Sequence, residues 1–321
     1  MRYNRLENAG IDISALTVGT WAIGGTTVSG RSWGKVDKNE SIKAIQAMIA
    51  NGVNCIDTAP IYGSGNSEIV VGEAIKYCRD KVILATKFGS FESAYKNRAI
   101  RDSRYDTVIR NCEESLQRLG TDYLDIYIQH WPDPDTPIEE TMAALNKLKE
   151  DGKIRFIGVS NYTQDMMEEA MRYARIDVMQ KPFSMVNQTE RKLMEWSAQH
   201  GIGVMSYGSL GAGILTGTIR ELPNFDEKDS RMTFYDFYRE PKFSKIMELL
   251  KTMDKISIER NKPLAQIAVN WSTQQNFIST SMVGVRNEAE ANENCAAYSW
   301  SLTDDEIKLL DRELERLGLV E

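Results

Sequence analysis

Residues 53–72 read VNCIDTAPIYGSGNSEIVVG, and this stretch decides how the rest of the chain is interpreted. It begins with a short apolar run, 53–57, which ends on Asp57. A turn containing proline and glycine follows, and Tyr62 stands in it five residues after Asp57. A short apolar run bounded by turn residues is typical of a buried strand. The stretch therefore predicts a strand whose end and following loop carry polar side chains.

Similar apolar runs recur along the chain and alternate with amphipathic segments of helical period. The predicted strands cover residues 15–21, 53–57, 82–87, 124–130, 154–161, 176–180, 202–207 and 278–285. Segments 41–52, 107–120 and 138–152 are predicted helices, and each ends at a glycine, as helices commonly do. Eight strands with helical connections predict an α/β fold in which a parallel sheet closes into a (β/α)8 TIM barrel. No linker or shift in composition divides residues 1–321, so a single domain is predicted.

Two segments depart from a minimal barrel. The N-terminus, residues 1–14, predicts a β-hairpin that turns at Asn8-Ala9-Gly10 and plugs the bottom of the barrel. The seventh and eighth predicted strands are separated by a long connection whose first part, 208–242, is rich in glycine, proline, charge and aromatic residues. A loop of this length is usually functional or disordered. The last helix is predicted to begin with a capping box, from Thr303 to Glu306.

Composition narrows the range of functions. With 321 residues and 42% hydrophobic content, the chain can bury one large core. The net charge is −7 and the charges are interspersed, which argues against a nucleic-acid surface. No apolar run reaches the ~18 residues of a membrane span. The N-terminus also lacks the layout of a signal peptide. We therefore expect neither a nucleic-acid nor a membrane partner.

Cysteine and histidine usage points away from metals and disulfides. The four cysteines, Cys55, Cys78, Cys112 and Cys295, are scattered without CxxC spacing. Most fall in apolar or amphipathic runs, which predicts buried free thiols and a reducing cytoplasm. The two histidines, His130 and His200, have no paired Cys/His spacing, so a zinc site is not expected. An enzyme with this composition would rely on a cofactor that brings its own chemistry.

Polar residues stand at the ends of successive predicted strands. They are Asp57, Lys87, His130, Ser160, Asn161, Gln180 and Tyr207. In barrel enzymes the active site lies at the C-terminal ends of the strands. Each residue alone has a structural explanation, such as capping a turn or filling the core. Their occurrence at successive strand ends favours one shared site.

The same segments resemble the aldo-keto reductase family. VNCIDTAPIYGSGNSEIVVG resembles its Asp-Thr-Ala-x-x-Tyr-Gly signature, ATKFG (85–89) its lysine segment, and IYIQHWPDP (126–134) its histidine segment. GVSN (158–161), SYGSLGAGILTG (206–217) and VGVRNEAEANEN (283–294) are similar to its nicotinamide, pyrophosphate and adenosine segments. The resemblance spans nearly the whole chain in the same order. It is nearest to bacterial members close to potassium-channel β subunits and general aldehyde reductases.

The resemblance implies four catalytic residues, Asp57, Tyr62, Lys87 and His130. Reduction of a carbonyl needs a hydride at carbon and a proton at oxygen, and Tyr62 would exchange that proton. A free tyrosine has a pKa of about 10, and Lys87 beside Tyr62 is expected to lower it. Asp57 would keep Lys87 charged and oriented. His130 would donate a hydrogen bond to the substrate oxygen.

The resemblance also implies a nicotinamide dinucleotide site across the same rim. Its predicted residues are Thr20, Trp21, Ser160, Asn161, Gln180, Tyr207, Gly208, Ser209, Leu210, Gly213, Leu215, Arg231, Gly284, Arg286, Glu290 and Asn294. The amide side chains would bind the carboxamide, Tyr207 would stack on the ring, and loop amides would line the pyrophosphate. One departure is Thr218, where the family often has a basic residue after Leu-Thr-Gly. Either Arg220 or Arg231 is expected to substitute for it, or the clamp on the pyrophosphate is weaker.

The choice of dinucleotide depends on the segment after the eighth predicted strand. Arg286 can meet the 2′-phosphate of NADP at a helix N-terminus. Glu290 and Asn294 share one helix face, and Asn294 would suit the adenine edge. Glu290 departs from the family habit of Gln or Arg and would repel a phosphate. We expect NADP(H) to be favoured with weak discrimination, and NAD(H) to be the alternative.

The predicted function is interconversion of a carbonyl (aldehyde, ketone or sugar) and an alcohol by an NAD(P)(H)-dependent oxidoreductase. Two alternatives are an NAD-linked sugar or polyol dehydrogenase and a cofactor-sensing regulatory subunit with incidental turnover. The partner would be a small carbonyl or hydroxyl compound. Four aromatic residues are expected either to form a substrate rim or to pack in the core: Trp21, Trp33, Phe88 and Trp131.

Overall fold

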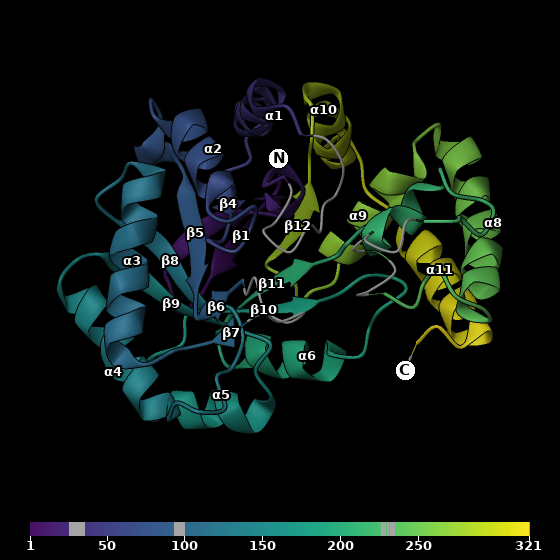
Figure 1. The fold of residues 1–321 in the computed structure, drawn as a ribbon. Coiled ribbons are helices and arrows are strands. Elements are labelled where there is room, and N and C mark those ends of the chain that lie inside the picture. The colour runs from purple at the N-terminus through teal and green to yellow at the C-terminus, as the bar shows by residue number, and fades with distance from the viewer. Residues whose placement is uncertain (26–35, 93–99, 226–228, 230, 232–234, 321) are drawn as a thin grey trace.

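Eight parallel strands close into one barrel, with helices around it (Figure 1). The computed structural model describes residues 1–25, 36–92, 100–225, 229, 231 and 235–320. Around the barrel the strand order is β3-β4-β5-β8-β9-β10-β11-β12, which is also the order along the chain. The predicted (β/α)8 barrel is therefore confirmed. Each pair of neighbouring strands is parallel, so all C-terminal ends meet at one mouth.

The elements fall close to the predicted ranges. The barrel strands are β3 (Leu16–Gly19), β4 (Cys55–Asp57), β5 (Ile83–Phe88), β8 (Leu124–Gln129), β9 (Ile154–Ser160), β10 (Val178–Pro182), β11 (Gly203–Tyr207) and β12 (Thr280–Gly284). The helices are α1 (Lys38–Ala50), α2 (Asn66–Ile75), α3 (Tyr105–Leu119), α4 (Ile138–Glu150), α5 (Gln164–Ala170), α6 (Arg191–Gln199), α8 (Lys242–Arg260), α9 (Leu264–Thr273), α10 (Glu288–Ala296) and α11 (Asp304–Leu317). Short 3-10 helices occur at η1 (Trp21–Ile23), η2 (Arg79–Lys81), η3 (Gly211–Thr216) and η4 (Ala297–Ser299).

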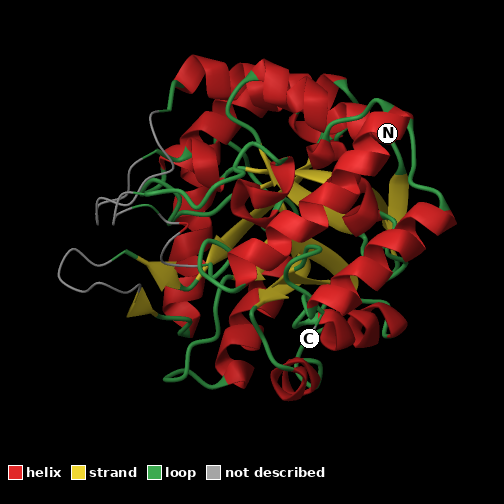
Figure 2. Ribbon diagram, turned by 90° about the vertical axis from the view of Figure 1, so that its right-hand side faces the viewer, coloured by secondary structure: helices red, strands yellow, loops and turns green. Residues whose placement is uncertain are grey.

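Helix α3 shows how the sequence sets the outer layer. Its buried residues recur with helical period, from Val108 through Cys112 and Leu116 to Leu119, and so form one apolar face. The helix ends at Gly120, whose φ of 64° is a left-handed conformation that glycine adopts at low cost. Viewed from the side, in Figure 2, helices lie around the strands. Packing between the helical faces and the outside of the barrel forms the main core.

The N-terminal hairpin closes the opposite end of the barrel from the mouth. Strands β1 (Tyr3–Leu6) and β2 (Ile11–Ser14) pair antiparallel around the predicted turn. The side chains of Leu6 and Ile13 are fully buried and pack with Cys55 and Val178, which lie at the first residues of their strands. The predicted plug is confirmed. The capping box of Thr303 and Glu306 is confirmed as well.

The long connection after β11 contains structure of its own. It begins with η3 and continues to α8 and α9, and α8 packs against α11. The hydroxyl of Tyr238 donates to the Ala212 carbonyl oxygen at 2.9 Å, so the two ends of the predicted 208–242 loop touch. None of the helices in the described ranges is long and apolar enough to cross a membrane. Of the cysteines, Cys55, Cys112 and Cys295 are buried, as predicted, and Cys78 is half-buried.

Candidate active site

A buried ion pair forms the base of the site. Asp57 is the last residue of β4 and Lys87 lies near the end of β5, and these strands are neighbours in the barrel. Lys87 Nζ donates to both carboxylate oxygens of Asp57 and to the carbonyl oxygen of Thr58 at 2.9 Å. Both side chains are at most 3% exposed. The pair is therefore held in one geometry below the mouth.

Tyr62 completes a chain of three groups. Its hydroxyl lies 3.2 Å from Lys87 Nζ, so the ammonium stands between the carboxylate and the phenol. The ring of His130 meets Tyr62 edge-on, with ring centroids 5.8 Å apart and an interplanar angle of 84°. The Trp21 ring stacks on the Tyr62 ring, with ring centroids 6.2 Å apart. The structure thus brings the four predicted catalytic residues together.

Burial changes the protonation expected of these groups. Desolvation raises the pKa of Tyr62, and Lys87 lowers it without fully offsetting the rise. Lys87 therefore lowers the pKa of Tyr62, as predicted, but burial outweighs the ammonium and the net pKa is raised. Burial alone would lower the pKa of Lys87, but Asp57 and Tyr62 together keep it above its usual value. Burial, with help from Lys87, holds the pKa of His130 well below its usual range. At neutral pH Tyr62 is thus protonated and His130 is neutral.

Two glycines fix the loop that carries Tyr62. A Cβ atom on Gly63 would lie 1.8 Å from the Gly24 carbonyl oxygen, and one on Gly24 would lie 2.7 Å from the Tyr62 carbonyl carbon. Gly63 also has a φ of 58°, a backbone conformation that residues other than glycine seldom adopt. The two backbones therefore touch only because both residues are glycine. Gly24 and Gly63 lie far apart in the sequence, which therefore does not predict this contact.

Hydroxyl groups behind the site were missed as well. Ser67 Oγ lies 2.8 Å from Thr20 Oγ1 and 3.0 Å from Thr58 Oγ1, and Thr20 Oγ1 donates to the Asp57 carbonyl oxygen at 2.9 Å. Thr20 is fully buried. Thr20 is a predicted cofactor-binding residue, and its hydroxyl group is engaged behind the site, where it orients the end of β4. The signal that could have found Ser67 is its place in the quoted 53–72 stretch.

The predicted nicotinamide residues lie together at the mouth. Asn161 directly follows β9 and has a φ of 63°, a strained conformation for a residue other than glycine. Its amide donates to the His130 carbonyl oxygen at 2.9 Å and to Ser160 Oγ at 3.0 Å, and its oxygen accepts from the Tyr207 hydroxyl at 3.0 Å. Gln180 is buried, with its amide nitrogen 3.4 Å from both Asp57 oxygens. These contacts link the amides to the catalytic group.

The loop after β11 has the shape of an anion cradle. Gly208 has a φ of 73°, and nothing lies within 4 Å of where its Cβ would be. Among the described residues, the amides of Gly208, Ser209 and Leu210 donate to no other backbone group. The amides of Gly213 and Leu215 differ from prediction, because both donate to the Leu210 carbonyl oxygen within the tight turn, at 3.0 and 3.2 Å. A backbone cradle of free amides fits a pyrophosphate.

Basic residues predicted to assist the cradle are paired in the structure. Arg231 forms an ion pair with Asp229 at 2.6 Å and lies over the Phe225 ring. Arg220 pairs with Asp254 at 2.7 Å. Either arginine would have to leave its aspartate in order to replace the basic residue that the family often has at the position of Thr218.

The predicted adenosine segment, residues 283–294, contains an exposed glycine, Gly284, and continues into α10. Arg286 Nη2 and the Arg286 backbone amide both donate to the Glu290 carboxylate, each at 2.9 Å. Asn294, one turn further, is only 7% exposed. The structure therefore joins Arg286 to Glu290 directly, a contact that their i,i+4 spacing permits.

The predicted aromatic rim is only partly present. Phe88 is 1% exposed and packs on Tyr127 with centroids 4.7 Å apart, so it belongs to the core and not to the rim. Its side chain points away from the mouth because residues alternate along β5. Trp131 is 40% exposed, and Trp21 stacks on Tyr62 as described. Trp33 lies outside the described residues.

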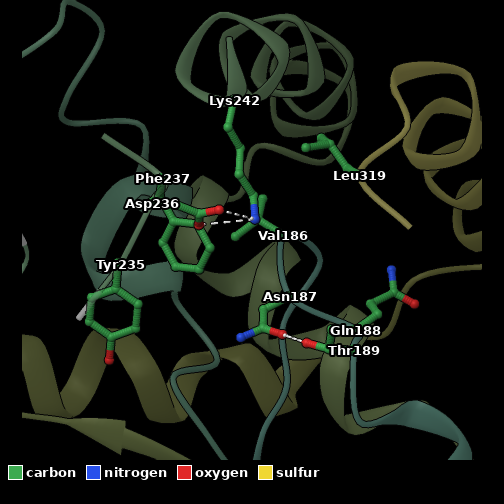
Figure 3. A pocket seen from close by; sticks show the side chains of 9 residues that line it. All are labelled: Val186, Asn187, Gln188, Thr189, Tyr235, Asp236, Phe237, Lys242 and Leu319. Carbon is green, nitrogen blue, oxygen red and sulfur yellow. Dashed lines mark hydrogen bonds and ion pairs between the residues drawn. The ribbon is translucent and has the colours of Figure 1, made fainter. Parts of the chain in front are cut away.

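A separate cavity of about 240 Å³ lies beside the long connection after β11. It is lined by Val186, Asn187, Gln188, Thr189, Tyr235, Asp236, Phe237, Lys242 and Leu319, none of which was predicted to be a site residue. Figure 3 shows two polar pairs on its wall, Asp236 with Lys242 and Asn187 with Thr189. These two pairs involve four of the nine lining residues.

Comparison with known proteins identifies the family. The model of the Aldo/keto reductase family matches residues 15–315. The chain belongs to the aldo/keto reductase family. Family members named below are reductases and a dehydrogenase, so the prediction of an oxidoreductase is confirmed.

Two bacterial relatives resemble the chain over almost its full length. The aldo-keto reductase YhdN of Bacillus subtilis (strain 168) is 35% identical and covers 98% of this chain and 94% of its own. An NADH-specific methylglyoxal reductase of Escherichia coli (strain K12) is 33% identical, over 97% of this chain and 98% of its own. Their bacterial origin agrees with the predicted branch of the family.

Solved structures share the barrel. A glycerol dehydrogenase from Gluconobacter oxydans has a TM-score of 0.89 at 33% identity and covers 99% of this chain and 97% of its own. An aldo/keto reductase from Klebsiella pneumoniae, in complex with NADP and acetate, has a TM-score of 0.73 at 26% identity, over 97% and 95% of the two chains.

Proposed function

We propose that this protein reduces small aldehydes or ketones, with Tyr62 as the proton donor to the carbonyl oxygen. The observation that carries the proposal is the chain from Asp57 through Lys87 to the Tyr62 hydroxyl, 3.2 Å from the ammonium. The protonated phenol suits reduction, in which a proton is given to oxygen. A nicotinamide dinucleotide, when bound, supplies the hydride for the carbonyl carbon.

The chain's own residues do the remaining work. His130 is neutral, so an imidazole N–H can donate to the substrate oxygen and stabilise the charge that develops there. Asn161, Ser160, Gln180 and Tyr207 would hold the nicotinamide end. The backbone amides of Gly208, Ser209 and Leu210 would hold the pyrophosphate, and Arg286 would hold the adenosine end. Lys87 limits the rise of the Tyr62 pKa, which keeps the proton transferable.

We propose NADP(H) as the favoured cofactor, through Arg286, with NAD(H) accepted because Glu290 opposes a 2′-phosphate. A family structure in complex with NADP supports the first choice, and a relative specific for NADH supports the second. The substrate is proposed to be a small carbonyl or hydroxyl compound. Residence in the cytoplasm and a single domain stay predictions.

A polyol dehydrogenase is the second candidate, favoured by the likeness to a glycerol dehydrogenase at a TM-score of 0.89. Oxidation of an alcohol needs Tyr62 as a base, and its raised pKa leaves little phenolate at neutral pH. Oxidation should therefore speed up as pH rises, whereas reduction should not. A cofactor-sensing subunit would instead retain the cofactor tightly and turn over very slowly with every substrate.

The test is a panel of aldehydes, ketones and polyols followed through the nicotinamide absorbance, with wild type and Tyr62→Phe. We expect turnover of an aldehyde or ketone that Tyr62→Phe reduces by roughly 10²–10⁴, the usual value of general acid catalysis. Cofactor affinity should be retained, since the phenol ring stays in place. A variant with more than about a tenth of wild-type turnover would contradict the proposed proton donor.

A further inference from the structure

Arg101, an arginine outside the predicted site, contacts Ser90 and Trp131, which follow Lys87 and His130 in the chain. Arg101 lies on β7 (Ile100–Arg101), which pairs antiparallel with β6 (Ser90–Phe91), so that Arg101 stands opposite Ser90. Its Nη1 donates to Ser90 Oγ at 2.6 Å. Its guanidinium carbon lies 4.9 Å from the centre of the Trp131 ring. Ser90 comes three residues after Lys87, and Trp131 directly follows His130.

The two strand ends that Arg101 bridges are themselves joined. The backbone N–H of His130 donates to the Phe88 carbonyl oxygen at 3.1 Å, which ties the end of β8 to the end of β5. Arg101 therefore lies over the junction from which both the ammonium and the imidazole extend. Its positive charge also contributes to the low pKa of His130, after burial and Lys87. The guanidinium and the imidazole thus share one side of the mouth.

This arginine has no anionic partner in the part of the chain that the structure describes. Its side chain donates to the Ser90 hydroxyl, and the carboxylate of the next residue, Asp102, pairs with Arg104 instead. The carboxylate that acts electrostatically on Arg101, Asp133, accepts hydrogen bonds from the Ser103 amide at 2.8 Å and from Thr136 Oγ1 at 2.7 Å. Arg101 is half-buried, and burial lowers its pKa despite Asp133. A half-buried cation that is not paired with a carboxylate is stabilised when an anion binds beside it.

The geometry points to an anion subsite, formed by Arg101, Ser90 and Trp131, that selects carbonyl substrates carrying a phosphate or carboxylate group. This inference rests on the proposed carbonyl reduction and adds a substrate class to it. A guanidinium stacked on an indole keeps its in-plane N–H groups free for oxygen atoms of an anion. The carbonyl end of such a substrate would lie toward His130 and Tyr62. Phosphate and carboxylate share this chemistry, so the experiment must separate them.

The experiment compares matched pairs of aldehydes that differ in charge. Glyceraldehyde 3-phosphate is set against glyceraldehyde, and succinic semialdehyde against butanal, with kcat and KM measured for each. The variants are Arg101→Met, which keeps an apolar stem, and Arg101→Lys, which restores a positive charge. The control is Arg104→Met, because Arg104 is 69% exposed and already paired with Asp102.

We expect wild type to prefer at least one charged member of the pairs. Arg101→Met should lower that preference about 10–100-fold, the effect of losing a charge-assisted hydrogen-bonded contact. The loss should appear mainly in KM, because the anion is bound equally in the ground and transition states. Arg101→Lys should recover part of it, and added salt should weaken it. The larger effect within the phosphate or the carboxylate pair identifies the anion.

An unchanged charged-to-neutral ratio in Arg101→Met would overturn the subsite, as would an equal loss in Arg104→Met. Turnover of neutral aldehydes with no preference for charge would overturn the subsite and leave the proposed function intact. If no aldehyde is reduced, the proposed function fails, and calorimetric titration with glyceraldehyde 3-phosphate and glyceraldehyde decides the subsite. Equal heats and affinities for both compounds, or for wild type and Arg101→Met, would then overturn it.

Discussion

Replacing Glu290 by glutamine should shift the protein toward NADP(H). In the structure the Glu290 carboxylate accepts from the Arg286 guanidinium and from the Arg286 backbone amide, each at 2.9 Å. The two donors with which this segment could hold a 2′-phosphate are therefore already taken. A phosphate must displace the carboxylate or bind beside it, and in both cases Glu290 opposes it.

The size of the effect follows from solvation. Two unit charges at 4 Å interact by about 1 kcal/mol in water and about 4 kcal/mol at an intermediate effective dielectric. The side chains of Arg286 and Glu290 are 59% and 33% exposed, which places the pair toward the water limit. We therefore expect about 1–2 kcal/mol, or a roughly 5–30-fold gain in NADPH affinity. NADH should gain nothing, because it lacks the phosphate and loses a carboxylate that could accept its ribose hydroxyl.

The assay is equilibrium binding of NADPH and NADH, followed by nicotinamide fluorescence at fixed ionic strength. Glu288→Gln is the matched control. Glu288 is exposed in the same first turn of α10, and its substitution removes the same charge from the helix N-terminus. The reasoning is refuted if Glu290→Gln leaves the NADPH-to-NADH affinity ratio unchanged, or shifts it no more than Glu288→Gln does. A wild-type preference for NADPH above about a thousandfold would also refute it, since nothing would then oppose the phosphate.

Three further outcomes follow from the site. Lys87→Met should abolish carbonyl reduction, and Asp57→Asn should slow it. Because the two residues act as one unit, the double variant should lose less activity than the product of the two single losses, and a loss equal to that product would contradict this. Because the pKa of Tyr62 is raised above its usual 10.0 and that of His130 lies well below 6.5, kcat/KM for reduction should stay level from about pH 7 to about pH 9. A fall in kcat/KM inside that range is the contrary result. Gly63→Ala should destabilise the fold by about 2–5 kcal/mol, from left-handed strain and overpacking, measured by denaturant unfolding; an unchanged midpoint would show that the loop relaxes.

The site could be predicted where its residues belong to short-range patterns. Asp57, Lys87 and His130 stand at or beside the ends of apolar runs, and parallel strands in a barrel bring such ends to one mouth. The resemblance supplied Tyr62, whose loop position the structure confirms. The sequence left Phe88 open between the rim and the core, because the direction of one side chain on a strand depends on register and not on hydrophobicity.

Sequence patterns by themselves determined the barrel, the plug, the helix ends and three polar groups at the mouth, Asp57, Lys87 and His130, whereas Tyr62 came from the family resemblance. Those features depend on periodicity, turn residues and chain order, which are local. Tertiary structure alone decided the contact of Gly24 with Gly63, the raised pKa of Tyr62 and the place of Arg101 over Trp131. Each of these depends on distances between segments far apart in the chain and on how much water burial removes. Neither quantity is encoded in the spacing of residues, because both arise only when the strands have closed around the core.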